Sequence, residues 1–133
     1  MFGPHARSYK KRMPKKMRSL ALRCLLSDKF NQQTLVVVQD LAIDGVKTKD
    51  IINVLGALEV GRTSLLVTAG TETNVSLSAR NVPGVKTLPA ALLNVGDLLK
   101  YESLVMTTDA LRLAEQMWGA GNLSREDGQK VKA

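Results

Sequence analysis

The sequence predicts an α/β fold: a three-layer αβα sandwich with a mainly parallel sheet of about four strands, plus a basic extended N-terminal arm. Its 133 residues suit a single domain with one core. Hydrophobic residues make up 44% of the chain and aromatic residues only 4%, so aliphatic side chains must fill that core. Short apolar runs alternate with segments of helical periodicity, which is the pattern of βαβ units.

Residues 1–13 are expected to form the extended basic arm, because Gly3-Pro4 is a turn signal and few apolar anchors follow it. Pro14 suits the first turn of a helix that should continue to about Lys29. We expect residues 14–118 to form the globular domain and residues 119–133 to be a disordered tail, since that tail is polar and rich in glycine.

Helical periodicity predicts which side of this first helix docks on the domain. The side expected to dock carries Met17, Leu20, Ala21, Cys24 and Leu25. The side expected to meet solvent or phosphate carries Arg12, Lys16, Ser19, Arg23 and Ser27. Leu22 and Leu26 lie beside or within the polar side, which leaves two readings open: a wide buried arc, or a partner that covers them.

The run Leu35-Val36-Val37-Val38 is apolar at successive positions and predicts a central parallel strand covered on both faces. Thr48 can cap a helix that continues to about Glu59. Ser64-Leu65-Leu66-Val67 repeats the strand signal about thirty residues after the first run, which is the spacing of a right-handed βαβ unit.

The second half of the chain predicts three further helices and two further strands. One helix should span about Glu72 to Asn81, a short one Asn94 to Tyr101, and a last one should start at a Thr107 or Thr108 cap and end near Trp118, before Gly119. Strands are expected at Val85–Leu88 and Leu104–Met106.

The net charge of +7 is unevenly distributed. Residues 1–29 contain nine Lys or Arg and one acid, which gives +8, whereas residues 30–133 contain ten bases and eleven acids, which gives −1. This asymmetry is typical of proteins that bind nucleic acid or an acidic membrane surface, although a basic tail can also serve solubility alone. His5 and Tyr9 add rings that can stack on unpaired bases, which favours RNA.

Signals for catalysis and for cofactors are weak. Asp40, Thr68 and Lys86 faintly resemble a phosphoryl-accepting receiver domain, but that domain's acidic metal-binding pair is missing. Ala69-Gly70-Thr71 is at best a weak anion nest, and neither a dinucleotide nor a P-loop fingerprint occurs. We therefore expect no catalytic site, no metal, no cofactor and no small-molecule substrate.

Cysteine and hydropathy patterns limit the remaining classes. Cys24 is the only cysteine, so it cannot form an intramolecular disulfide, and its predicted place on the docking face of a helix suggests a packing role. No apolar stretch approaches the roughly 20 residues that cross a bilayer, and the N-terminus lacks a secretory signal. These patterns predict a soluble intracellular protein without a membrane partner.

An ordered set of motifs covers about residues 2–118. The motifs are Phe2-Gly3-Pro4-His5-Ala6-Arg7-Ser8-Tyr9, Met13-Pro14-Lys15-Lys16-Met17-Arg18, Leu20-Ala21-Leu22-Arg23, Lys47-Thr48-Lys49, Ser64-Leu65-Leu66-Val67-Thr68, Ala79-Arg80-Asn81-Val82-Pro83, Leu93-Asn94-Val95-Gly96-Asp97-Leu98-Leu99 and Val105-Met106-Thr107-Thr108-Asp109-Ala110. Together they resemble bacterial-type large-subunit ribosomal protein L four, a universal family. Each motif is modestly specific, but their shared order and spacing make coincidence implausible.

The resemblance implies a structural constituent of the large ribosomal subunit that binds ribosomal RNA early in assembly, in bacterial cytoplasm or in an organelle. It implies large-subunit ribosomal RNA and neighbouring ribosomal proteins as partners, and in some relatives a messenger RNA. In whole family members an N-terminal region and a long basic loop precede the globular part that this chain matches. The implied RNA contacts are His5, Arg7, Tyr9, Lys10, Lys11, Arg12, Lys15, Lys16, Arg18 and Arg23.

Two other functions stay open beside this one. The same basic arm would serve an RNA-binding translational or transcriptional regulator outside the ribosome. A small phosphate-handling α/β enzyme, built on the polar residues at the strand ends, is the more remote alternative.

Overall fold

The structure, a computed structural model, describes Gly3 and residues 14–119. Helices and strands alternate along the described chain as the sequence predicts, with one short 3-10 helix, η1, in addition. In order the elements are α1 (Lys15–Asn31), β1 (Leu35–Val38), α2 (Thr48–Ala57), β2 (Ser64–Thr68), α3 (Thr73–Arg80), β3 (Val85–Pro89), η1 (Ala90–Leu92), α4 (Val95–Lys100), β4 (Ser103–Thr107) and α5 (Thr108–Trp118).

All four strands are parallel, in the order β1-β4-β2-β3. Every residue of the two middle strands, β2 and β4, is buried, which explains their unbroken apolar runs. The prediction that Leu35–Val38 forms a central strand is wrong, because β1 lies at one edge and Val37 is 42% exposed. Beta-branched residues favour a strand at either place. β1 stays at the edge because β4, later in the chain, pairs on its inner side, and no strand of the described residues pairs on its outer side.

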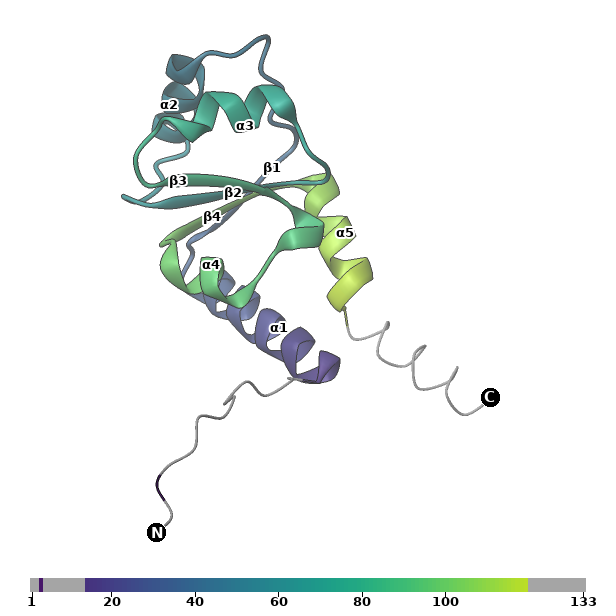
Figure 1. Cartoon of the computed structure of the whole chain (residues 1–133). Coiled ribbons are helices and arrows are strands. Elements are labelled where there is room, and N and C mark those ends of the chain that lie inside the picture. The colour runs from purple at the N-terminus through teal and green to yellow at the C-terminus, as the bar shows by residue number, and fades with distance from the viewer. Residues whose placement is uncertain (1–2, 4–13, 120–133) are drawn as a thin grey trace.

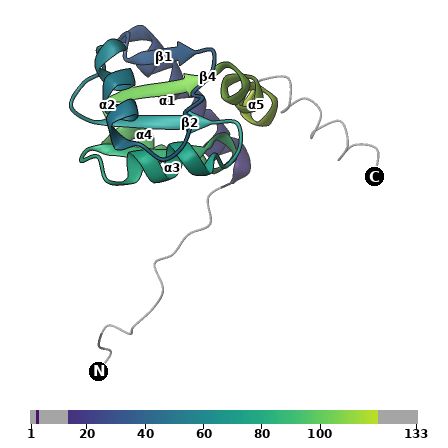
Figure 2. The same cartoon turned by 90° about the horizontal axis from the view of Figure 1, so that it is seen from above.

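The sheet lies between two layers of helices, α2 and α3 on one face and α1, α4 and α5 on the other (Figure 1). Leu66 and Val105 point from the middle strands toward the α2–α3 layer, and Leu65 and Leu104 point into the opposite core. Figure 2 shows the strands side by side beneath α2 and α3. The connections β1–β2 and β2–β3 pass one face and β3–β4 returns over the other, so all three have the same hand.

Two helix starts are capped by the residues that the sequence favours. Asn94 Oδ1 accepts from the Asp97 N–H at 2.8 Å, and Thr107 Oγ1 accepts from the Ala110 N–H at 3.2 Å. Thr48 does not cap α2 but is its first residue. The chain is extended one residue earlier because the Lys47 N–H donates to Ser78 Oγ of α3 at 3.0 Å. Pro14 likewise directly precedes α1 rather than standing inside its first turn.

The predicted docking face of α1 is wrong at Met17, Leu20 and Cys24, although Leu25, which it also contains, packs against the core. Leu22 is the most buried apolar residue of the helix, at 5% exposed, whereas Met17 and Leu20 are 57% and 53% exposed. Cys24 is also exposed, so it has no core packing role. Of the two readings left open for Leu22 and Leu26, the structure favours a buried arc on that side, because Leu22 belongs to the core and Leu26 packs against it.

None of the helices in the described part of the chain is both long and apolar enough to cross a membrane.

Candidate nucleic-acid interface

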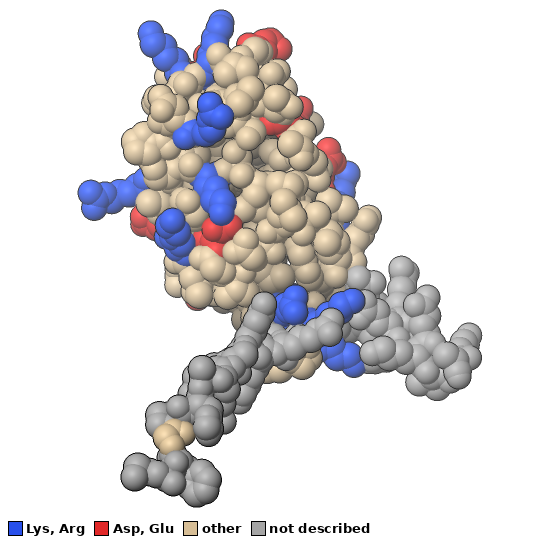
Figure 3. Space-filling model, viewed as in Figure 1, with Lys and Arg blue, Asp and Glu red and all other residues tan. Residues whose placement is uncertain are grey.

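Three of the predicted RNA contacts, Lys15, Lys16 and Arg18, are exposed in the first turn of α1. Figure 3 shows blue side chains at the lower end of the described part of the molecule, where α1 lies. The first turn contains no acidic residue, and the residue before the helix, Pro14, makes no side-chain cap. Positive charge is therefore concentrated at this end of the helix.

Cations at the amino end of a helix oppose its macrodipole. The first backbone N–H groups already carry positive potential there, and each adjacent cation destabilises the helix by about 0.3–1 kcal/mol. A phosphate placed at this end would interact favourably with both the N–H groups and the side chains. The first turn of α1 is thus better suited to binding a polyanion than to stabilising its own helix.

Arg23 does not lie on an open polar face as predicted. It is half-buried, and its Nε is a buried side-chain nitrogen without a hydrogen-bond partner. The groove that it lines on α1 also contains Leu20, Cys24, Ser27, Asp28 and Asn31. Its neighbour in sequence, Leu22, turns into the core, whereas the other residues of this groove are all exposed.

The other predicted contacts lie outside the described residues. They are His5, Arg7, Tyr9, Lys10, Lys11 and Arg12.

Lys29 has a role that charge patterning missed. The side chain is buried, and its Nζ donates to the carbonyl oxygens of Tyr101 and Glu102 at 2.7 and 2.8 Å. It therefore ties the end of α1 to the segment between α4 and β4. A lysine in the last turn of a basic helix gives no sign in the sequence that it will point inward.

Four exposed cations from distant segments surround the amino end of β3, and sequence patterning missed these as well. They are Arg62, Arg80, Lys86 and Lys100. The signal was hidden because each one stands among neutral or acidic neighbours in the sequence.

The receiver-like set is not assembled. Asp40 follows β1 and Thr68 is the last residue of β2, so both lie at the carboxyl ends of the strands. Lys86 is the second residue of β3 and therefore lies at the amino ends. Lys86 Nζ instead pairs with Asp97 Oδ2 of α4 at 2.9 Å. Thr68 Oγ1 donates to the Gly70 carbonyl at 2.6 Å, so this hydroxyl stabilises the loop before α3.

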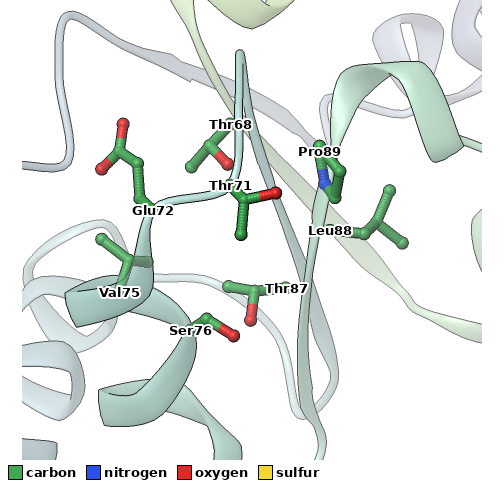
Figure 4. Close-up of a pocket in the computed structure, with 8 residues that line it drawn as sticks. All are labelled: Thr68, Thr71, Glu72, Val75, Ser76, Thr87, Leu88 and Pro89. Carbon is green, nitrogen blue, oxygen red and sulfur yellow. The ribbon is translucent and has the colours of Figure 1, made fainter.

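A small pocket opens at the carboxyl ends of β2 and β3 (Figure 4). Hydroxyls of Thr71, Ser76 and Thr87 line it, and Glu72 points away from Thr87 (Figure 4). The pKa of Glu72 is raised, first by burial and then by the nearby Asp40. With a volume of about 40 Å³ the pocket is far smaller than the roughly 300–1,000 Å³ of typical ligand sites. It does not support the phosphate-handling alternative.

Within residues 14–119 and Gly3, no three His, Cys, Asp or Glu side chains are grouped so that they could hold a metal ion.

Comparisons with known proteins agree with the resemblance in the sequence. Residues 1–117 match the family described as "Ribosomal protein L4/L1 family". The protein named "Large ribosomal subunit protein uL4" is 47% identical in Dehalococcoides mccartyi over 118 residues, 89% of this chain and 56% of the relative. The corresponding proteins of Desulforamulus reducens and Carboxydothermus hydrogenoformans are 47% and 45% identical, over 88% and 89% of this chain. The chain spans little more than half the length of these relatives. On these matches and the α/β fold, the chain belongs to the ribosomal protein L4/L1 family.

Proposed function

We propose that this protein is a structural constituent of the large ribosomal subunit and binds ribosomal RNA through the basic residues at and before the start of α1. The concentration of cations at the positive end of α1 is the observation that carries the proposal. Its relatives bear the name of a large-subunit ribosomal protein, which supports the same assignment.

Binding would work by charge neutralisation rather than by chemistry. Lys15, Lys16 and Arg18 displace counterions from phosphates, and the neutral α/β domain holds them in a fixed geometry. The basic and aromatic residues of the preceding segment extend the same contact: His5, Arg7, Tyr9, Lys10, Lys11 and Arg12. Arg23 is less suited, because its Nε is buried and has no hydrogen-bond partner.

The partners that follow are large-subunit ribosomal RNA and the ribosomal proteins beside it. The assembled subunit in the bacterial cytoplasm is the expected location, since the relatives named above are bacterial. Catalysis is not part of this function. The pocket at the carboxyl ends of β2 and β3 is small, and Lys86 of the receiver-like set lies at the opposite, amino end of β3.

A triple variant, K15Q/K16Q/R18Q, tests the proposal. We expect the wild-type protein to co-sediment with large subunits and to be released only at high salt. In the variant, log affinity should fall less steeply with log salt. The magnitude of the slope should decrease by about 2 to 3, because each phosphate that is no longer neutralised reduces it by roughly 0.7–0.9. K47Q/K49Q/R112Q removes the same charge from the start of α2, the residue before it, and α5, and should keep the wild-type slope. Equal slopes for both variants would contradict the proposed interface, and recovery of the wild type on one transcript away from ribosomes would favour the regulator.

A further inference from the structure

We propose that Arg62, Arg80, Lys86 and Lys100 form a second contact site for RNA phosphates, at the amino end of β3. We call these four residues the β3-end cluster. The inference rests on the proposed function but adds a surface separate from the start of α1. With this second site, the neutral domain would itself bind RNA instead of only supporting the start of α1.

A close turn brings the two arginines of the cluster to the same end of the sheet. Arg62 precedes β2, and Arg80 is in the last turn of α3, just before the turn into β3. The Ser64 N–H donates to the Gly84 carbonyl at 2.8 Å. A Cβ added at Gly84 would meet the Arg62 carbonyl oxygen at 2.9 Å, and the φ of Gly84 is +79°. Only glycine therefore fits here, and it fixes the backbone of Arg62 beside the α3–β3 turn.

The two lysines join the cluster through α4. Lys86 Nζ lies 2.9 and 3.0 Å from the two carboxylate oxygens of Asp97. The hydrogen bond from Lys86 is the main cause that lowers the pKa of Asp97, and Lys100, one turn further along α4, adds the smallest contribution through its charge. Lys86 and Lys100 are thus neighbours around one acid.

Positive charge exceeds negative charge at this end of the sheet. Asp97 is already engaged by Lys86, and the Glu102 carboxylate packs where a side chain at Gly61 would stand. Glu59 also lies at this end, three residues before Arg62, so the four cations outnumber these three acids. Figure 3 shows blue side chains gathered on this side of the domain, with few red ones among them.

This arrangement fits phosphates better than it fits structural pairing. All four cations are exposed, and among the described residues neither arginine has a carboxylate within 4 Å. Like charges held together without full neutralisation destabilise a fold, and a polyanion removes that repulsion. Guanidinium groups present forked donors that match phosphate oxygens. β3 is an edge strand, so the cluster lies on an open side of the sheet, along which the sugar-phosphate backbone of RNA can run.

The test compares R62Q/R80Q with R112E in the full chain, using bacterial large-subunit ribosomal RNA as the probe and varying the salt. Both variants lower the net charge by two units, but R112E does so on α5. We expect R62Q/R80Q to decrease the magnitude of the slope of log affinity against log salt by about 1.4–1.8, because two phosphates are no longer neutralised. R112E should leave the slope unchanged. Acetylation of Lys86 and Lys100 in the wild type should also fall when RNA is bound.

The outcomes separate this inference from the proposed function. If the wild type binds RNA and K15Q/K16Q/R18Q weakens it, but R62Q/R80Q behaves as R112E does, the β3-end cluster is not a contact site. If Lys86 and Lys100 stay fully reactive in the complex, the site is likewise excluded. Binding of the cluster to anionic lipid vesicles, with none to RNA, would overturn the choice of partner. A wild type that does not bind the RNA at all would overturn both proposals.

Discussion

Apolar runs occur in the middle strands β2 and β4 and in the helix α1. The sequence predicts which residues are buried in the strands, but not which are buried in the helix. Every residue of both strands is buried, whichever face of the sheet it points to. In α1, Leu22 is buried while Leu20 and Met17 are exposed. A strand between two helix layers buries both of its faces, so composition alone predicts the outcome. A helix on the outside of the sandwich buries one stripe, and its packing against α4 and α5 selects that stripe.

The sharpest test of this difference is a pair of leucine substitutions within α1. Leu22→Ala should lower the free energy of unfolding by about 2–4 kcal/mol, because it removes buried methyl groups and leaves a cavity against the core. Leu20→Ala, two residues away, should change it by no more than about 0.5 kcal/mol, since that side chain is exposed. Denaturant titration of both variants measures the difference. A larger decrease for Leu20→Ala than for Leu22→Ala would show that α1 docks through the face the sequence predicts.

Lys29 extends the comparison to a charged residue of the same helix. Lys29→Met keeps most of the aliphatic length but leaves the carbonyls of Tyr101 and Glu102 without their donor. We expect the free energy of unfolding to fall by about 1–3 kcal/mol, the usual cost of a buried polar group without its charged partner. Lys49→Met, which removes the same charge from an exposed position in α2, is the matched control and should have little effect. Thermal unfolding temperatures that fall equally in both variants would mean that Lys29 acts only through its charge.

Much of the fold could be predicted from the sequence because its signals are local. Apolar runs predict β2 and β4, and the Asn94 and Thr107 caps act over three residues. The edge position of β1 could not be predicted, since it depends on β4, some seventy residues later in the chain. The same limit applies to the interface. Lys15, Lys16 and Arg18 stand out as a charge run, whereas Arg62 and Lys100 come together only through β2, α4 and the Gly84 turn.

The smallest expected change in the free energy of unfolding is at Asp97. This residue takes part both in the local helix cap with Asn94 and in the long-range ion pair with Lys86. Its N–H is held by Asn94, and its carboxylate accepts from Asn94 Nδ2 and from Lys86 Nζ, whose hydrogen bond is the largest cause of its lowered pKa. A lowered pKa means that the ionised carboxylate stabilises the folded state. That stabilisation is complete above the unfolded pKa of about 3.9 and is lost as the pH falls through the lower folded value.

Asp97→Asn should therefore lower the free energy of unfolding by about 1 kcal/mol at pH 7, because Lys86 is half exposed and solvent weakens the pair. The difference from the wild type should shrink below about pH 4 and vanish once the wild-type carboxylate is protonated. Asp44→Asn, in the exposed loop before α2, should show no such pH dependence. If instead the Asp97→Asn difference stays constant from about pH 7 to about pH 2.5, the carboxylate's charge is irrelevant. The Asn94 cap and the packing of Leu98 in the core would then account for the position of α4, and the ion pair with Lys86 would add nothing measurable.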